Sequence, residues 1–230
     1  MLISGHATNV TTIGHLFGAK DLILHDELIH NSILQGIILS GAKRLPFPHN
    51  DSAALETILT EQRPHFERVL IALEGIYSMD GDYPDLKRLV ELKKKYHFVL
   101  ILDEAHGTGI LGNSGAGLAE ETGTSNEVDI IIGTFGKSLA GMGAYVLTNL
   151  LPIIEYLTNK AGEYIYSTFL SPHQTGVALA SIDVVRNAHE KRESLKLLSR
   201  WLRSRLVEYI DVQTNYNTPI IPLIVGSNDD

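Results

Sequence analysis

Short apolar runs alternate with longer amphipathic stretches along most of the 230-residue chain. Short runs of this kind predict buried strands, and the amphipathic stretches between them predict helices that cover those strands. The alternation is typical of an α/β fold with a mostly parallel sheet and helices on both faces. We expect strands at residues 22–24, 44–47, 69–73, 98–102, 130–132 and 144–147, and helices at 9–17, 31–40, 52–62, 85–96, 117–121 and 150–160.

The pattern changes at Pro172. Residues 172–187 and 190–209 predict two long helices, and a last strand is expected at 220–225. The second long helix carries leucines at helical spacing, which are Leu195, Leu198, Leu202 and Leu206. We therefore predict a large domain over residues 1–210 and the start of a small C-terminal domain over 211–230. The chain is expected to be truncated at both ends, because it opens directly on a helix start and stops at a new strand.

Composition narrows the function classes only slightly. Apolar residues make up 44% of the chain and charged residues 20%, which is ordinary for a soluble enzyme. The net charge of −8 argues against a nucleic-acid partner or an anionic membrane surface. The absence of cysteine excludes disulfides and thiolate metal sites, and it favours a cytoplasmic location. No apolar run approaches the roughly 20 residues of a membrane span.

Polar side chains follow two of the predicted strands. Asp103 comes directly after the run FVLIL, and Lys137 follows the run DIII about one βαβ unit later. Parallel strands would bring both side chains to the same C-terminal edge of the sheet, where open α/β folds bind ligands. His106 lies in the turn after Asp103, where Gly107 and Gly109 allow close approach of the backbone. An acid, an imidazole and an amine are therefore predicted at one edge.

A third segment, SGHATN at residues 4–9, predicts a turn that opens a helix. The free N–H groups and the dipole of a helix start attract phosphate. An aldehyde cofactor with a phosphate and a protonated ring nitrogen would use all of these groups. Pyridoxal 5′-phosphate has this chemistry, with Lys137 forming an imine and Asp103 pairing with the pyridinium nitrogen.

Each of these residues also has an ordinary interpretation when it is taken alone. A single aspartate after a strand is usually a cap or turn residue, and a single lysine is usually a solvated charge. Other motifs fail at one position: Ile131 replaces the first glycine of a phosphate-binding loop, and Ala116 replaces the last glycine of G-x-S-x-G. A nucleotide-binding dehydrogenase is disfavoured because no predicted strand is followed by G-x-G-x-x-G.

The sequence strongly resembles the α-oxoamine synthases, a family of fold-type I pyridoxal-phosphate enzymes. The family includes 8-amino-7-oxononanoate synthase, 2-amino-3-ketobutyrate ligase, 5-aminolevulinate synthase and serine palmitoyltransferase. The matching segments occur in family order across nearly the whole chain, and they are SGHATN, DELIHNS, EGIYSMDGD, LDEAHGTGILGNSGAG, TFGKSLAG and YSTFLSP. The resemblance implies the large domain of the fold-type I transferases.

The resemblance also implies roles for single residues. His30 would stack on the cofactor ring, Asp103 would pair with the ring nitrogen, and His106 would bond the phenolic oxygen. Lys137 would form the imine and later act as the general base. The remaining residues implied at the cofactor are Ser4, Gly5, His6 and Thr134 at the phosphate, Ser78 beside the cofactor and substrate, and Thr168 at the phosphate of a neighbouring subunit. Thr168 therefore implies a homodimer with shared active sites.

The activity implied is the decarboxylative condensation of an amino acid with an acyl thioester, carried on coenzyme A or on an acyl carrier protein, to an aminoketone. His6 stands where the family commonly has an aromatic residue, and HNS replaces the commoner HAS; neither change removes a reacting group. Two alternatives stay open. One is a pyridoxal-phosphate aminotransferase, and the other is a truncated or split-gene product that binds cofactor with little activity.

Overall fold

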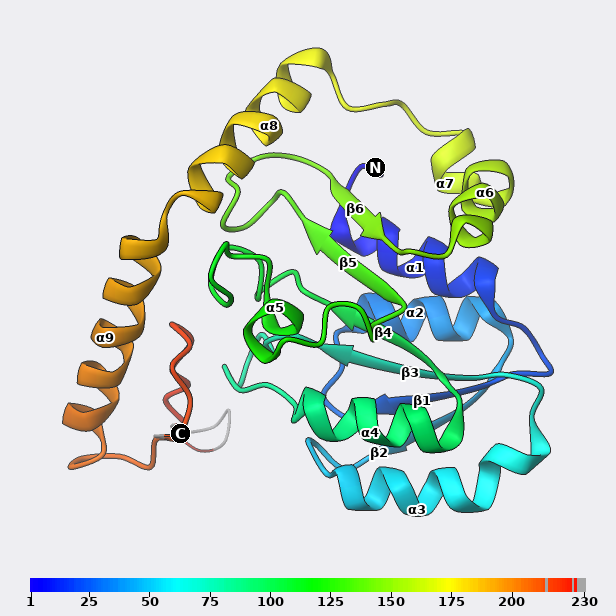
Figure 1. The fold of residues 1–230 in the computed structure, drawn as a ribbon, viewed down its shortest axis with the longest axis horizontal. Coiled ribbons are helices and arrows are strands. Elements are labelled where there is room, and N and C mark those ends of the chain that lie inside the picture. The colour runs from blue at the N-terminus through cyan, green and yellow to red at the C-terminus, as the bar shows by residue number, and fades with distance from the viewer. Residues whose placement is uncertain (214, 225, 227–230) are drawn as a thin grey trace.

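A computed structural model describes residues 1–213, 215–224 and 226. Its centre is a sheet with strand order β2-β1-β3-β4-β5-β6, in which all neighbours are parallel except the antiparallel pair β5 and β6 (Figure 1). The strands are β1 (Leu22–Asp26), β2 (Lys43–Phe47), β3 (Val69–Glu74), β4 (Val99–Asp103), β5 (Ile130–Thr134) and β6 (Ala144–Leu147). The predicted mostly parallel sheet is confirmed.

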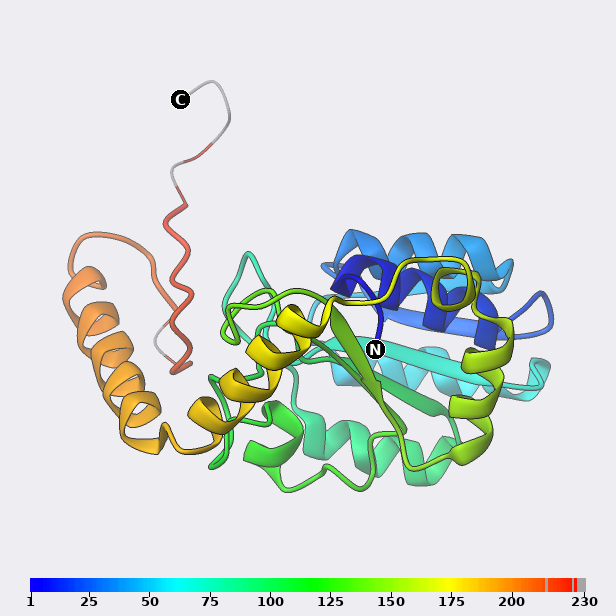
Figure 2. The same cartoon turned by 90° about the horizontal axis from the view of Figure 1, so that it is seen from above.

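Helices cover both faces of this sheet (Figures 1 and 2). The helices of the described residues are α1 (Gly5–Leu16), α2 (Asn31–Ser40), α3 (Ser52–Gln62), α4 (Leu86–Tyr96), α5 (Leu118–Thr122), α6 (Leu151–Lys160), α7 (Gly162–Ile165), α8 (Pro172–Arg186) and α9 (His189–Leu206), with a 3₁₀ turn at Arg63–His65. Alternate strand residues point to opposite faces, because side chains alternate along a strand. Leu22 and Leu24 join the core beneath α3, α4 and α5, whereas Ile23 joins the core beneath α1 and α2.

The helices α1 and α2 pack closely where α2 has a glycine. A Cβ atom on Gly36 would lie 2.9 Å from the backbone oxygen of Asn9 in α1. A larger residue would push the two helices apart, because that oxygen is backbone and cannot move alone. The packing brings Asn9 of α1 next to Ser32 of α2 and to Asp103 at the carboxyl end of β4.

Three sequence expectations need correction. The first helix begins at Gly5 rather than at residue 9, because Ser4 caps it by accepting the N–H of Ala7. The short helix α7 was not expected. The last strand is wrong over residues 220–224, because no neighbouring strand in the described chain forms a ladder with it; residue 225 lies outside the described residues.

The two long helices extend from the sheet on one side (Figure 1). Their predicted bounds agree with α8 and α9 to within a few residues. The predicted leucine spacing of α9 does not mark its buried face, however. Leu198 and Leu202 are exposed, and the buried side chains of this helix are Arg192, Ser199 and Arg203.

Candidate active site

A cavity of about 200 Å³ lies at the carboxyl ends of β3, β4 and β5. It is lined by Gly5, His6, Asn9, His30, Ser32, Glu74, Asp103, Ala105, His106, Thr134, Gly136 and Lys137. The strand register explains why residues from three strands reach the same cavity, because Asp103 pairs with Glu74 on one side and with Ile132 on the other. Most of the residues predicted for the cofactor therefore reach one cavity.

Asp103 and Lys137 place a carboxyl group and an amine on this cavity. Burial raises the pKa of Asp103, while the side chain of Asn9, the backbone of Ala105 and the charges of Lys137 and His30 lower it. Desolvation lowers the pKa of Lys137, and the charges of Asp103 and Glu74 oppose that change. A lowered pKa increases the fraction of neutral amine, which is the nucleophilic form.

His106 is a neutral imidazole at physiological pH. Burial, followed by the charges of Lys137 and His30, lowers the pKa of His106 to about 4. A neutral imidazole carries one N–H donor and one acceptor nitrogen. His106 can therefore donate a hydrogen bond to a ligand oxygen without adding a positive charge to the cavity.

His30 is held at the start of α2 through both its backbone and its ring. Its backbone N–H donates to Glu74 Oε1 at 2.6 Å, and its Nδ1 accepts the backbone N–H of Ser32 at 3.2 Å. The imidazole is thus the N-cap of α2, while the residue itself remains exposed. An imidazole fixed in this way can face a planar ligand in the cavity.

The start of α1 has features that suit a bound anion. The first turn of this twelve-residue helix contains no acidic residue. Thr134 Oγ1 lies beside it, 3.7 Å from the position of a Cβ atom on Gly5, and accepts the N–H of Gly136 at 3.1 Å. Free N–H groups and the helix dipole make such a site favourable for phosphate.

The glycines of the DEAHGTG turn allow close approach to side chains. A Cβ atom on Gly107 would lie 1.9 Å from Glu104 Oε2. Gly109 has φ of +82°, and a Cβ atom there would lie 2.6 Å from Ser138 Oγ. Both glycines fit their predicted purpose, although the group that approaches each is a protein side chain.

Three predicted residues do not line the cavity. Ser4 lies beside it as the N-cap of α1. Ser78 follows β3, and its backbone lowers the pKa of Glu74. Thr168 lines a separate cavity of about 240 Å³ with residues 1–3 and Glu163. The structure therefore brings the amine, carboxyl and imidazole groups together and leaves Thr168 apart from them.

Comparison with known proteins identifies the family. The sequence model of the family described as aminotransferase class I and II matches residues 1–229. The chain belongs to this family. Within the aminotransferase class I and II family, a relative from Bacillus cereus (strain Q1) is 41% identical over 98% of the chain. A second, from Syntrophotalea carbinolica, is 38% identical over 97% of it. Both carry the provisional name 8-amino-7-oxononanoate synthase.

Solved structures give the same placement within the family. A serine palmitoyltransferase from S. paucimobilis with a bound PLP–myriocin aldimine has a TM-score of 0.92 at 30% identity. An 8-amino-7-oxononanoate synthase from Francisella tularensis has a TM-score of 0.82 at 28% identity. The alignments cover 100% and 95% of this chain, and 60% and 63% of those proteins. The resemblance to α-oxoamine synthases is confirmed, and the chain spans 57 to 58% of the curated relatives.

Sequence reasoning missed three polar side chains of this aminotransferase-family cavity, namely Asn9, Ser32 and Glu74. A signal for Glu74 was present, because it follows the apolar run VLIAL just as Asp103 follows FVLIL. Asn9 and Ser32 stand at the ends of the segments SGHATN and DELIHNS, but only the packing of α1 against α2 shows that they meet.

The described residues contain neither a cluster of metal ligands nor a membrane-spanning helix. None of their His, Asp and Glu side chains form a group of three or more that could hold a metal ion. Within residues 1–213, 215–224 and 226, no helix has both the length and the apolar character of a membrane span.

Proposed function

We propose that the cavity holds pyridoxal 5′-phosphate. The observation that carries the proposal is that an amine, two buried carboxyl groups and three imidazoles line one cavity beside a helix start with no acidic residue in its first turn. When bound, this cofactor supplies an aldehyde that bonds amines and a ring that delocalises negative charge. The groups that line the cavity match the three chemical parts of the cofactor. The amine suits the aldehyde, the carboxylate suits the ring nitrogen, and the helix start suits the phosphate.

Each residue that the sequence predicts at the cofactor has a proposed task. Asp103 holds the ring nitrogen protonated, His106 donates to the phenolic oxygen, and His30 faces the ring. Lys137 bonds the cofactor. The phosphate is held by Ser4, Gly5, His6 and Thr134, with Ser78 near the substrate.

The proposed activity is that of an acyltransferase that joins an amino acid to an acyl thioester with loss of carbon dioxide. The names of the relatives support it. In this proposal Lys137 Nζ accepts the proton that leaves the amino-acid α-carbon, and its lowered pKa increases the fraction of the neutral amine that the step needs. His106, being neutral, adds no charge that would oppose this transfer.

The proposal includes a cytoplasmic homodimer in which Thr168 reaches the phosphate of the partner subunit. Its support is the position of Thr168, which lines a separate cavity instead of the one that contains Lys137. Equilibrium sedimentation of the purified chain tests the dimer, and a monomer at all concentrations contradicts it.

The cofactor assignment is tested by absorbance and borohydride reduction. The purified chain mixed with pyridoxal 5′-phosphate is expected to give a visible band and, after reduction, a stable adduct at Lys137. Lys137→Ala is expected to lose the adduct, because no other amine lines the cavity among the described residues. Lys160→Ala, an exposed lysine, is the control. An adduct at full occupancy in Lys137→Ala would show that Lys137 is not the residue that bonds the cofactor.

The type of reaction is tested by adding glycine, alanine or serine and following the products. An acyltransferase consumes the thioester and releases carbon dioxide, whereas an aminotransferase requires a keto-acid acceptor. Amino-group transfer to a keto acid, with the thioester left intact, would replace the proposed activity by that of an aminotransferase.

A further inference from the structure

A buried chain of hydrogen bonds connects Asp103 to His30 through two residues with no task in the proposed function. The Asn9 amide nitrogen donates to Asp103 Oδ2 at 2.7 Å and to Ser32 Oγ at 2.9 Å. Ser32 Oγ in turn lies 2.7 Å from His30 Nδ1. Asn9 is 2% exposed and Ser32 is 1% exposed, so water does not compete for these bonds.

The chemistry of the groups fixes the direction of each bond. The amide nitrogen of asparagine only donates, so Ser32 Oγ accepts from Asn9. The backbone N–H of Ser32 donates to His30 Nδ1 at 3.2 Å. Because Nδ1 accepts that bond, it carries no hydrogen in the neutral form of the ring, and the Ser32 hydroxyl donates to it as well. The single ring hydrogen of the neutral form then lies on Nε2.

The orientation of the Asn9 side chain follows from its neighbour. Turning the amide over would set its oxygen against the Asp103 carboxylate, and two acceptors would then face each other without a hydrogen. The other carboxylate oxygen, Oδ1, accepts the backbone N–H of Ala105 at 2.8 Å. Donors from two different segments thus bind both oxygens of Asp103 and fix the orientation of the carboxylate plane.

We propose that Asn9 and Ser32 are positioning residues, with Asn9 orienting the Asp103 carboxylate and Ser32 keeping the His30 hydrogen on Nε2. The inference rests on the proposed function for the tasks of Asp103 and His30. It adds that these two groups, which lie on different elements, are set by one shared network. A substitution of Asn9 is therefore expected to affect both Asp103 and His30.

The state of His30 is measured in the cofactor-free chain by NMR of ¹⁵N-labelled histidine, with His30→Gln to assign the resonances. The wild-type spectrum is expected to show the hydrogen on Nε2. Ser32→Ala leaves only the longer backbone contact with Nδ1, so a mixture of the two neutral forms is expected. Ser32→Thr keeps a hydroxyl group and is expected to restore the wild-type spectrum.

The state of Asp103 is measured through the affinity for pyridoxal 5′-phosphate. Asn9→Asp keeps the shape of the side chain but cannot donate to Asp103 when ionised. Its dissociation constant is expected to rise by about ten- to a hundredfold, since a hydrogen bond to a charged group is lost. Ser32→Ala loses a bond between neutral groups, and a rise of about two- to tenfold is expected.

Thr12→Val is the matched control, because Thr12 lies on the same helix, is 1% exposed and has a hydroxyl group without a partner in the described chain. Thermal unfolding checks that each variant folds. If Asn9→Asp does not fold, the Ser32→Ala and Ser32→Thr pair decides.

The inference is overturned if folded Asn9→Asp binds the cofactor as Thr12→Val does, or if Ser32→Ala keeps the wild-type His30 resonances. If the wild-type chain fails to bind the cofactor, the proposed function is wrong, but the inference about the network can still be tested. The His30 resonances test that network in the cofactor-free protein.

Discussion

Three carboxyl groups, those of Glu74, Asp103 and Glu104, lie buried at adjoining strand ends. Their exposed fractions are 3%, 5% and 0%. Burial raises the pKa of all three, to about 8 for Glu74 and about 7 for Glu104. Among the described residues, none of the three forms an ion pair within 4.0 Å. Ionising this group of acids therefore costs free energy of folding.

Glu74 provides a pH test at the scale of one residue. Its folded pKa of about 8 lies above the unfolded value of about 4.3, so the folded chain holds a proton that the unfolded chain releases between these values. The free energy of unfolding is thus expected to fall as pH rises from about 4 to 8, by at most about 3–5 kcal/mol. Glu74→Gln keeps an oxygen for the His30 N–H and should lose the part of this dependence that Glu74 contributes, while the part from Asp103 and Glu104 remains.

The measurement is urea unfolding of the cofactor-free chain at several pH values, for the wild type and for Glu74→Gln. The exposed Glu67 gives the control variant Glu67→Gln, which should keep the wild-type dependence. Parallel curves for the wild type and Glu74→Gln over this pH range would show that Glu74 is already ionised in the folded chain.

At the scale of elements, His49 ties together the segments that follow β1, β2 and β3. Its Nδ1 lies 2.8 Å from Asp26 Oδ1, and its Nε2 lies 2.8 Å from Asp82 Oδ2. Burial lowers the pKa of His49, but the hydrogen bonds and charges of Asp26 and Asp82 outweigh it and raise the pKa to about 10. The protonated ring therefore joins two buried carboxylates near the loops that carry His30 and Ser78.

His49→Leu is expected to destabilise the chain by about 3–5 kcal/mol at pH 7, because it leaves two buried carboxylates without a cation. In the wild type, the contribution of His49 is complete below its unfolded pKa of about 6.5 and is lost as pH rises through about 10. Urea unfolding between pH 6 and 10 measures both effects. The exposed His65 supplies the control variant His65→Leu. If His49→Leu loses as much stability between pH 6 and 10 as the wild type does, His49 is not the group that causes this loss.

The elements also show how much the sequence could predict. Apolar runs followed by Asp103 and Lys137 marked the sheet edge correctly, because strand direction and the position of a polar residue are local properties. The network of Asn9 and Ser32 could not be predicted in this way, since it depends on how closely Gly36 lets α2 approach α1. The failed strand over residues 220–224 has the same cause, because an apolar run becomes a strand only beside a partner strand.

At the scale of the whole molecule, Arg203 joins α9 to the C-terminal segment. It is 2% exposed, and its guanidinium donates to the backbone oxygens of Gln213 (2.9 Å), Thr218 (3.1 Å) and Ile220 (2.6 Å). Thr218 Oγ1 continues the connection by donating to the backbone oxygen of Gly81, in the turn after β3.

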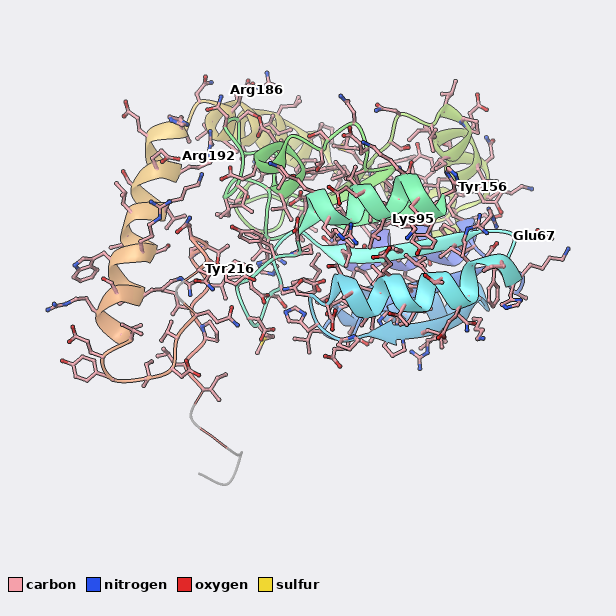
Figure 3. The ribbon with its side chains drawn as sticks, turned by 60° about the horizontal axis from the view of Figure 1, so that its bottom comes forward. Glu67, Lys95, Tyr156, Arg186, Arg192 and Tyr216 are labelled. Atoms are coloured by element: carbon pink, nitrogen blue, oxygen red, sulfur yellow. The ribbon has the colours of Figure 1, made fainter. Side chains whose placement is uncertain are left out.

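Aromatic packing supports the same connection. The ring of Tyr216 packs edge-on against Tyr83, with 4.9 Å between ring centroids, and Figure 3 shows Tyr216 between α9 and the sheet. Arg192, at the other end of α9, donates to the backbone oxygen of Val185 in α8 and to that of Asn113. The buried side chains that hold α9 therefore include two arginines, while Leu198 and Leu202 are exposed.

Arg203→Met tests this connection, because methionine fills a similar volume but donates no hydrogen bond. Leaving the three backbone oxygens without their donor is expected to cost about 1–2 kcal/mol, which raises the open population of the segment about 5- to 30-fold. Chymotrypsin cleavage after Tyr216, followed by mass spectrometry, should accelerate by that factor while the sheet domain stays intact. Arg205→Met removes an exposed arginine from the same helix and should leave the rate unchanged. Equal rates in both variants would mean that the segment is held by Tyr216 and its neighbours without Arg203.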